Sequence, residues 1–296
     1  MSHTILVTGA AGHLGRAVVG HLLDTQKVDA ARIVAASRDP AKLADLAARG
    51  VAIRKGDFDD AASLESAFAG IDRLLIVSTD ALAVPGQRLT QHKTAIAAAV
   101  KAGVKHLFYT SMPKPDDSLV SFAPDHLGTE EAVKASGLAY TILRDAWYHD
   151  NLLHSLPHNL STGTWYSASG DGRIATIARD DCARAIAAAL ASPTTPGDTT
   201  YTLTGPAAIT TDEIAAIAAE VAGKPLKVVR VSDEQLAAGL KGAGIPDFFA
   251  TVLVSADANT RTGRFDIVTD DFEKLTGAKP QSLKDFLSVH KAALTA

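Results

Sequence analysis

The chain has 296 residues, of which 47% are hydrophobic and 21% are charged. This composition supports a large buried core and excludes an intrinsically disordered protein. The 29 Lys and Arg against 33 Asp and Glu leave a formal net charge of −4 with both signs interspersed, so no basic stripe indicates binding to nucleic acid.

Short apolar or β-branched runs alternate with helical patterns through the first half of the chain, which is typical of βαβ units and a parallel sheet. Six strands are predicted, at Thr4–Thr8, Arg32–Ser37, Ala52–Lys55, Arg73–Val77, His106–Thr110 and Ala139–Arg144. Helices are predicted between them, at 14–25, 40–49, 61–69, 86–102 and 125–136. Because crossovers between parallel strands are right-handed, this order predicts an α/β fold with a doubly wound parallel sheet, the Rossmann fold.

Beyond Tyr148 the pattern is interrupted by Pro157 and several glycines. Helices are still predicted at Arg179–Ala191 and Thr210–Ala222, and strands at Thr200–Thr204 and Lys227–Val231. We therefore expect a dinucleotide-binding domain over residues 1–148 and a smaller mixed C-terminal lobe over residues 149–296 that binds substrate. Some segments of this lobe are expected to rejoin the Rossmann sheet.

A glycine-rich turn follows the first strand and opens directly into a helix, with the sequence Thr8-Gly9-Ala10-Ala11-Gly12-His13-Leu14-Gly15. Gly9 permits the tight turn, Gly12 lets backbone N–H groups approach a pyrophosphate, and Gly15 lets the helix pack close to the strand. The helix N-terminus adds a positive dipole end. The alternative is a glycine-rich turn that binds nothing. The turn lacks a Gly-Lys-Ser/Thr ending, which disfavours a nucleotide triphosphate site.

The end of the second strand distinguishes NAD from NADP. Arg38, helped by Ser37, can form forked hydrogen bonds to a 2′-phosphate, so NADP(H) is the expected cofactor. The alternative is a solvated arginine beside Asp39. After the third strand, Asp57 could accept a hydrogen bond from the adenine amino group and Phe58 could pack on the base. The alternative there is helix capping by Asp59 or Asp60, which is compatible with both roles.

Short-chain dehydrogenases normally carry Tyr-x-x-x-Lys, because the phenol donates a proton to a carbonyl while the lysine lowers its pKa. None of the five tyrosines has a lysine four residues later; the residues at those positions are Pro113, Arg144, Leu152, Gly170 and Gly205. Alcohol–ketone chemistry by that mechanism is therefore disfavoured. A sugar-nucleotide epimerase is disfavoured for the same reason.

Several segments recur in the order found in one known family. They are Val7 to Gly15, Ser37-Arg38-Asp39-Pro40-Ala41-Lys42, Gly56-Asp57-Phe58, Ala102-Gly103-Val104-Lys105-His106 and Leu143-Arg144-Asp145-Ala146-Trp147-Tyr148. Together they resemble the NmrA-like atypical short-chain dehydrogenases, and within that family the NADPH:quinone oxidoreductases and the triphenylmethane dye reductases. The resemblance extends through Gly170-Asp171-Gly172-Arg173 to the final helix.

The resemblance implies hydride transfer from nicotinamide directly to an electron-poor acceptor, without a strong protein acid. This agrees with the missing tyrosine, because a quinone that accepts hydride becomes a delocalised phenolate. The resemblance also implies cofactor contacts from Gly9–Leu14, Arg38, Val77-Ser78-Thr79, Thr110-Ser111 and Tyr140-Thr141-Ile142-Leu143-Arg144-Asp145. The family usually has Asn where this chain has Asp145, so an acid beside the nicotinamide could alter carboxamide binding or rate.

His126 and Glu130 resemble a His-x-x-x-Glu pattern of the quinone reductases, and at this spacing they share one helix face. His126 could protonate the acceptor or bind the nicotinamide ribose; a surface helix pair is the alternative. With Asp145 and Tyr148, it is a candidate catalytic residue. Trp147 and Tyr148 follow the sixth strand at the sheet edge where such folds bind ligands. They could bind a flat acceptor, although Trp147 also suits core packing, and Phe248 with Phe249 could close the pocket.

Three histidines and a single cysteine bear on metal binding and on the cellular compartment. His149, His154 and His158 lie close in sequence, but Pro157 interrupts their helix and no compact ligand set completes a site, so we expect no metal. The only cysteine, Cys182, is expected within a helix, and a single cysteine fits a reducing compartment. The sequence also shows no secretory leader and no run of about 18 apolar residues, so we expect a cytoplasmic protein without a membrane partner.

The leading function is an NADPH-dependent reductase of quinone-like or dye-like acceptors. A dinucleotide-sensing regulator without turnover is the alternative, and a homodimer is left open.

Overall fold

The computed structural model describes residues 3–194 and 197–295. The chain forms two compact units. Unit 1 consists of Met1–Met112, Asp125–Arg144 and Cys182–Tyr201, and unit 2 of Pro113–Pro124, Asp145–Asp181 and Thr202–Ala296. Both units are discontinuous in sequence, and the division at residue 148 remains our proposal for how the binding roles are shared.

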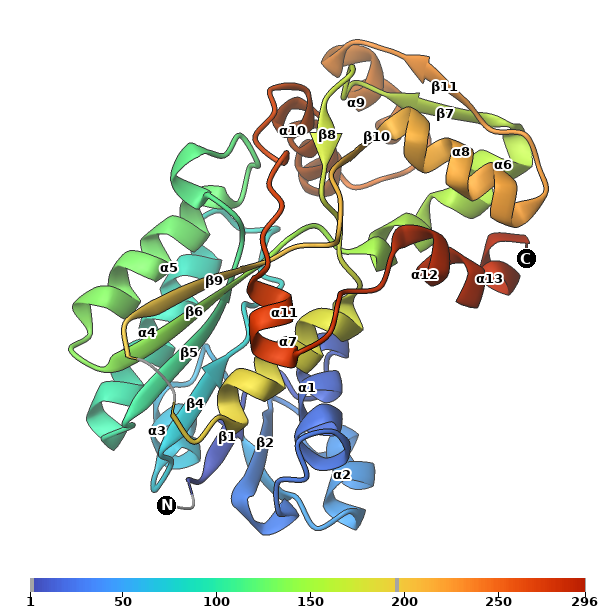
Figure 1. Cartoon of the computed structure of the whole chain (residues 1–296). Coiled ribbons are helices and arrows are strands. Elements are labelled where there is room, and N and C mark those ends of the chain that lie inside the picture. Colours follow the sequence, from blue (N-terminus) through green and yellow to red (C-terminus); the bar gives the residue numbers. More distant parts are fainter. Residues whose placement is uncertain (1–2, 195–196, 296) are drawn as a thin grey trace. The chain divides into compact units, whose positions relative to one another are not determined.

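A seven-stranded sheet forms the centre of unit 1 (Figure 1). Its strand order is β3-β2-β1-β4-β5-β6-β9, and every pair whose register is described is parallel. This order confirms the predicted doubly wound fold, because it reverses direction between β1 and β4. The strands are β1 (Ile5–Val7), β2 (Ile33–Ser37), β3 (Ala52–Lys55), β4 (Arg73–Ile76), β5 (His106–Ser111), β6 (Ala139–Asp145) and β9 (Thr199–Leu203).

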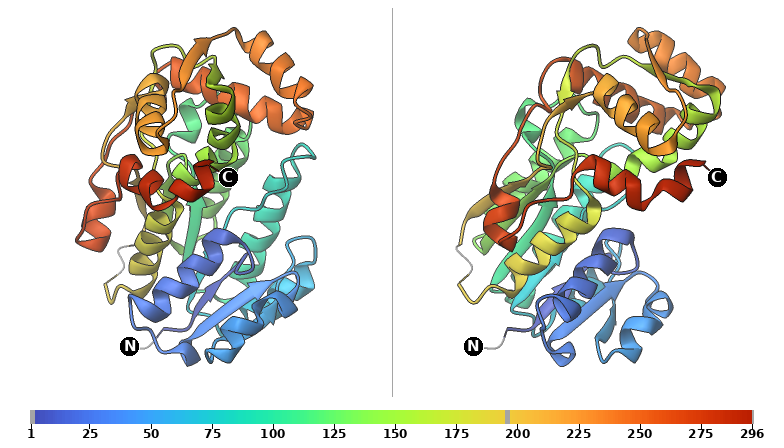
Figure 2. Two further views of the ribbon diagram at one scale, coloured as in Figure 1. Left: turned by 90° about the vertical axis from the view of Figure 1, so that its right-hand side faces the viewer. Right: turned by 45° about the vertical axis from the view of Figure 1, so that its right-hand side comes forward.

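Helices cover both faces of this sheet (Figures 1 and 2). The helices α3, α4 and α5 lie on one face, and α1, α2 and α7 lie on the other. Helix α1 buries Gly15, Val18, Val19 and Leu22, a spacing that places all four on one helical stripe. The bounds are α1 (His13–Asp24), α2 (Ala44–Ala48), α3 (Ala61–Phe68), α4 (Gln87–Ala102), α5 (Ala123–Ala135) and α7 (Arg179–Ala191).

One expectation about these elements needs correction. The helix expected at 40–49 is a 3-10 turn at Pro40–Leu43 followed by the short α2, because Asp39 caps the turn through the Ala41 N–H at 3.2 Å and the chain turns at Gly50 with φ of +86°. The sheet has a seventh strand, β9, at the edge beside β6. Strand β9 lies in the region of which some segments were expected to rejoin the Rossmann sheet, and local sequence does not say which of them does so.

Unit 2 contains two small sheets and several short helices. Strand β7 (Thr164–Ser167) pairs in parallel with β11 (Lys227–Arg230), and β8 (Arg173–Ile174) pairs antiparallel with β10 (Ile209–Thr210). Helix α8 lies beside β11 (Figure 2) and begins with a capping box between Thr210 and Glu213. The helices are η3 (Pro115–Asp117), η4 (His149–His154), α6 (Leu156–Thr162), α8 (Thr211–Ala222), α9 (Asp233–Gly242), α10 (Asp247–Arg261), α11 (Asp271–Thr276), α12 (Leu283–Val289) and α13 (Lys291–Thr295). None of the helices in the described ranges combines the length and the apolar character needed to cross a bilayer.

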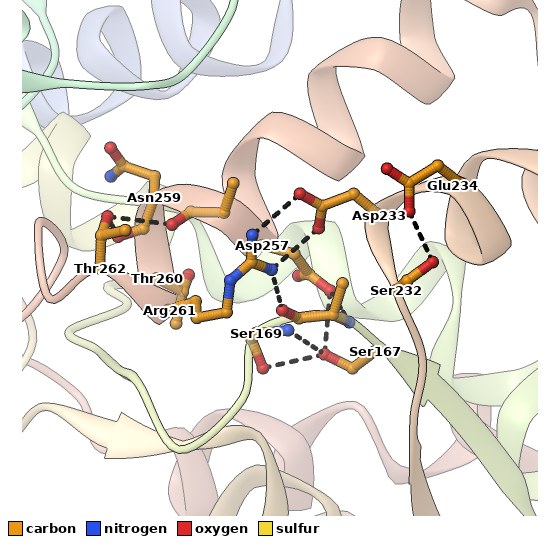
Figure 3. Close-up of polar contacts among 12 residues, drawn as sticks. Ser167, Ser169, Ser232, Asp233, Glu234, Asp257, Asn259, Thr260, Arg261 and Thr262 are labelled. Carbon is orange, nitrogen blue, oxygen red and sulfur yellow. Dashed lines mark hydrogen bonds and ion pairs between the residues drawn. The ribbon is translucent and has the colours of Figure 1, made fainter.

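A polar cluster ties the segment after β7 to α9 and α10 (Figure 3). The Asp257 carboxylate accepts hydrogen bonds from the Ser167 hydroxyl at 2.9 Å and from the Ala168 N–H at 2.7 Å. Arg261 pairs with both carboxylate oxygens of Asp233, at 2.8 Å each, and also donates to the Ala168 carbonyl. These contacts hold the residue run 167–169 against α10.

Gly172 lies close to the backbone of α10. A Cβ atom at Gly172 would stand 2.0 Å from the Thr260 carbonyl oxygen, which forces the backbone to move. We expect Gly172→Ala to lower the free energy of unfolding by about 3 kcal/mol, as overpacking against a fixed neighbour does. Urea unfolding checks this, with Gly239→Ala in α9 as the control, because nothing lies within 4 Å of its Cβ position. Equal midpoints for the two variants would contradict the prediction.

Candidate cofactor and active site

The turn between β1 and α1 has the geometry of a phosphate-binding turn. Gly9 adopts φ of +60°, where side chains are disfavoured. A Cβ at Gly15 would lie 2.5 Å from the Gly9 carbonyl oxygen, so only glycine allows α1 to approach this closely. Gly12 is the N-cap of α1 and forms no side-chain cap hydrogen bond, so the first-turn N–H groups are left to an external acceptor.

Arg38 stands directly after β2 and is exposed. The neighbouring Ser37 is buried, and its hydroxyl accepts from the Asp39 N–H at 3.1 Å. Asp39 is occupied in capping the next turn. Within residues 3–194 and 197–295, Arg38 forms no hydrogen bond or ion pair, so its guanidinium can meet a phosphate. A solvated arginine, the alternative, would have the same exposed position.

Asp57 and Phe58 lie after β3, where an adenine was expected. The Asp57 carboxylate accepts from the Asp59 N–H at 3.1 Å, and Asp60 caps α3 through the Ser63 N–H at 3.1 Å. The ring of Phe58 is 8% exposed and belongs to the core. Helix capping at Asp60 is therefore present, and the adenine contacts of Asp57 and Phe58 remain predictions.

Three consecutive residues after β4 are held by side chains from other elements. The N–H of Val77 donates to Thr8 Oγ1 at 2.9 Å, and the N–H of Ser78 donates to Thr110 Oγ1 at 2.9 Å. The N–H of Thr79 donates to Nε2 of His92 in α4 at 3.0 Å. This segment lies where the strand order reverses, which is where open α/β sheets bind their ligands.

His126 and Glu130 share a face of α5 as predicted, but both are buried, so a surface pair is wrong. His126 lies 2.8 Å from the Tyr109 hydroxyl, measured from its Nδ1 atom. Burial, with the nearby Arg88 and His92, holds the pKa of His126 well below its ordinary value, so the ring is neutral. The surface pair was the alternative because polar residues on a helix usually face solvent; here both side chains are buried.

Glu130 forms an ion-paired cluster that the sequence did not indicate. Its carboxylate accepts from Arg144 Nε at 2.8 Å and Nη2 at 2.6 Å, and from the Ser111 hydroxyl at 2.7 Å. Arg144 is the residue before the last of β6 and Ser111 ends β5, so the cluster lies at the carboxyl edge of the sheet. Polar residues at the carboxyl ends of two neighbouring strands were the available signal, and Arg144 and Ser111 were predicted as cofactor contacts.

Asp145 and Tyr148 contact each other in unit 2. The Tyr148 hydroxyl donates to Asp145 Oδ2 at 2.7 Å, and Asp145 is 8% exposed. Arg179 lies over the Tyr148 ring, 5.2 Å from its centroid, and pairs with Asp150. An asparagine at 145 could also accept from this hydroxyl, so the departure from the family pattern changes the charge more than the contact.

The predicted substrate residues lie in unit 2 without a common cluster. Trp147 packs on Phe265 with ring centroids 5.9 Å apart, in keeping with the core-packing alternative. Phe248 in α10 is 43% exposed beside Phe249. Cys182 is buried in α7. His149 is buried while His154 and His158 are exposed, and no three potential ligands gather as a metal site in the part of the chain that the structure describes.

These residues fit a bound dinucleotide. The open N-terminus of α1, the close approach at Gly15 and the exposed Arg38 provide sites for a pyrophosphate and a 2′-phosphate within unit 1. Comparison with known proteins agrees. The model of the NmrA-like family matches residues 1–287. The chain belongs to the NmrA-like family.

Several known proteins are similar to this chain over almost their whole length. Quinone oxidoreductase 2 of Escherichia coli strain K12 is 38% identical over 284 residues, which cover 96% of this chain and 97% of the relative. The crystal structure of an Escherichia coli NADPH-dependent quinone oxidoreductase complexed with NADPH has a TM-score of 0.92 at 37% identity, covering 97% of this chain and 99% of that one. Citrobacter sp. triphenylmethane reductase complexed with NADP(H) has a TM-score of 0.90 at 34% identity, with the same coverage. The resemblance read from the sequence is confirmed.

Proposed function

We propose that this protein is an NADPH-dependent oxidoreductase that transfers a hydride to a quinone or a similar conjugated, electron-poor acceptor. The phosphate-binding turn at α1, with Arg38 at the end of the adjacent strand, is the observation that carries the proposal. Full-length similarity to a quinone oxidoreductase and to a triphenylmethane reductase supports the reaction class. A bound nicotinamide would supply the hydride.

The chain's own residues would bind and orient rather than supply a strong acid. No tyrosine is followed by a lysine four positions later, and His126 is buried and neutral. A neutral imidazole is better suited to hydrogen bonding than to donating a proton from a cationic form. A quinone that accepts hydride becomes a delocalised anion that can take its proton from water, so positioning and electrostatic stabilisation suffice.

We assign the remaining roles from geometry and sequence position. Tyr148, held by Asp145 and packed under Arg179, and Trp147 offer flat surfaces to a flat acceptor. Arg144, fixed by Glu130, is assigned to the nicotinamide end of the cofactor. Phe248 is assigned to the acceptor as well. These assignments are part of the proposal.

The assay that tests the function measures NADPH oxidation with benzoquinones, naphthoquinones and cationic dyes. Turnover with several acceptors of this kind is the expected result. Tight binding of NADP(H) with no turnover on any acceptor would contradict the proposal and would favour a dinucleotide sensor.

Arg38→Ala tests the choice of cofactor. Because the substitution removes charge-assisted hydrogen bonds to the 2′-phosphate, we expect KM for NADPH to rise about 10- to 100-fold, with KM for NADH unchanged. Steady-state kinetics with both cofactors measures this. Arg49→Ala is the control, because Arg49 pairs with Asp24 at 2.6 Å. An equal loss with NADPH and NADH would show that Arg38 does not read the phosphate.

A further inference from the structure

The residues 77–79 after β4 are held by three side-chain acceptors from three different elements. Thr8 directly follows β1, and Thr110 lies within β5. His92, the third acceptor, comes from α4 and is completely buried. Since all three N–H groups are occupied within the protein, this segment can meet a ligand only with its carbonyl groups and side chains.

The hydrogen-bond partners of His92 determine which ring nitrogen carries the proton. Because the Thr79 N–H can only donate, Nε2 of His92 must be the acceptor and must lack a proton. The proton is therefore on Nδ1, which lies 2.9 Å from Thr129 Oγ1. The Thr129 hydroxyl in turn donates to the Asp125 carbonyl at 2.6 Å. A single tautomer of His92 thus satisfies every hydrogen bond in the series that links the segment after β4 to α5.

The surroundings of His92 keep this tautomer neutral. The centroid of its ring lies 5.5 Å from that of Tyr109 and 6.4 Å from that of Phe58, and both contacts are edge-on. Burial and the nearby Arg88 lower the pKa of His92 to about 3. A second proton would remove the acceptor of the Thr79 N–H, and it would add a charge where a cation already lies.

We propose that His92 is a positioning residue of the cofactor site, which fixes residues 77–79 through the Thr79 N–H. The inference rests on the proposed function, because it assigns the ordered segment to a bound dinucleotide. A segment that lost this contact would reach its binding-competent arrangement less often, and the apparent Kd would rise in proportion. Nothing in this role requires His92 to touch the cofactor.

Two substitutions at His92 separate its two hydrogen bonds. Glutamine extends to the position of Nε2 and can accept from Thr79, whereas asparagine extends only to the position of Nδ1 and can keep the contact with Thr129. We expect His92→Asn to raise the Kd for NADPH about 10-fold, the effect of one unsatisfied buried N–H. We expect His92→Gln to bind NADPH within about threefold of the wild type, because it restores the acceptor.

The experiment measures Kd by fluorescence titration and the free energy of unfolding for the wild type and both variants. Nitrogen-15 NMR of histidine-labelled protein adds a direct readout, which should show Nδ1 of His92 protonated and Nε2 unprotonated. Equal NADPH affinity in the asparagine and glutamine variants, or the opposite tautomer, would overturn the positioning role while leaving the proposed function intact. A wild-type protein that does not bind NADP(H) would overturn the proposed function, and the cofactor role of His92 with it.

Discussion

Acidification from about pH 7.5 to about pH 5 is expected to lower the free energy of unfolding by about 6 kcal/mol. The cause is a set of three buried histidines, which are His92, His106 and His149, and the buried His126 acts in the same direction. Burial lowers the pKa of His92 to about 3 and those of His106 and His149 to about 4, and it holds that of His126 well below its ordinary value. A loss of this size is comparable to the whole stability of a typical protein.

The direction follows from the protons that each state binds. In the unfolded chain His92, His106 and His149 titrate near pH 6.5, while in the folded protein their pKa values are lowered to about 4 or about 3 and the rings stay neutral above that pH. Their stabilising contribution is therefore fully present above about pH 6.5 and is lost as the pH falls toward the folded pKa values. Each of these three histidines accounts for about 2 kcal/mol over this range. Asp125 and Asp257, whose pKa values are raised by burial, work in the opposite direction.

Equilibrium urea unfolding at the two pH values measures the effect. His106 provides a matched test, since its Nε2 lies 2.9 Å from Thr141 Oγ1 and its ring stacks on Phe108. His106→Gln removes one titrating group and should reduce the pH-dependent loss by about 2 kcal/mol. The exposed His154 is the control, and His154→Gln should leave the loss unchanged. A wild-type protein equally stable at both pH values would contradict the account of the buried histidines.

Replacing Glu130 by Gln is expected to lower the free energy of unfolding by about 3 kcal/mol. Glu130 is fully buried, and its carboxylate is the acceptor for both Arg144 and Ser111. Removing its charge leaves the half-buried guanidinium of Arg144 without a full counter-charge in a site of low polarity. We also expect weaker NADPH binding, because Arg144 is assigned to the cofactor site and would lose its fixed orientation.

The charge neutralisation can be tested within the same helix. Glu131→Gln changes an exposed neighbour and should alter the free energy of unfolding by less than about 0.5 kcal/mol. If the loss in Glu130→Gln comes from the missing counter-charge of the Arg144 guanidinium, then adding Arg144→Met should recover part of the stability. A double variant whose loss equals the sum of the two single losses would show that the two groups do not stabilise each other.

Local features of the site could be predicted from the sequence, and long-range ones could not. The turn over Gly9, Gly12 and Gly15 depends on spacing within one βα unit, so its geometry follows from the residues themselves. The pairing of Glu130 with Arg144 joins α5 to the end of β6, and His92 reaches across from α4 to Thr79. Such contacts depend on which helix face meets the sheet, which periodicity cannot specify when the helix carries polar residues on several sides.

Because packing depends on contacts that are distant in sequence, local patterns also could not fix the burial of α5 or the position of β9. The pattern on α5 correctly placed His126 and Glu130 on one face, but it left a surface pair as an alternative that only the packing of the helix excludes. The strand at β9 was expected, yet its place beside β6 depends on the path of the chain between the two units.

The central claim is that a hydride passes directly from NADPH to the acceptor. The most direct measurement uses NADPH carrying deuterium at either face of nicotinamide C4, with a cationic triphenylmethane dye whose reduced central carbon retains the transferred hydrogen. The account predicts that one of the two labelled cofactors delivers deuterium to that carbon, with one NADPH consumed for each dye molecule reduced. Saturating binding of NADPH without reduction of the dye, or a reduced dye that carries no deuterium from either labelled cofactor, would contradict it.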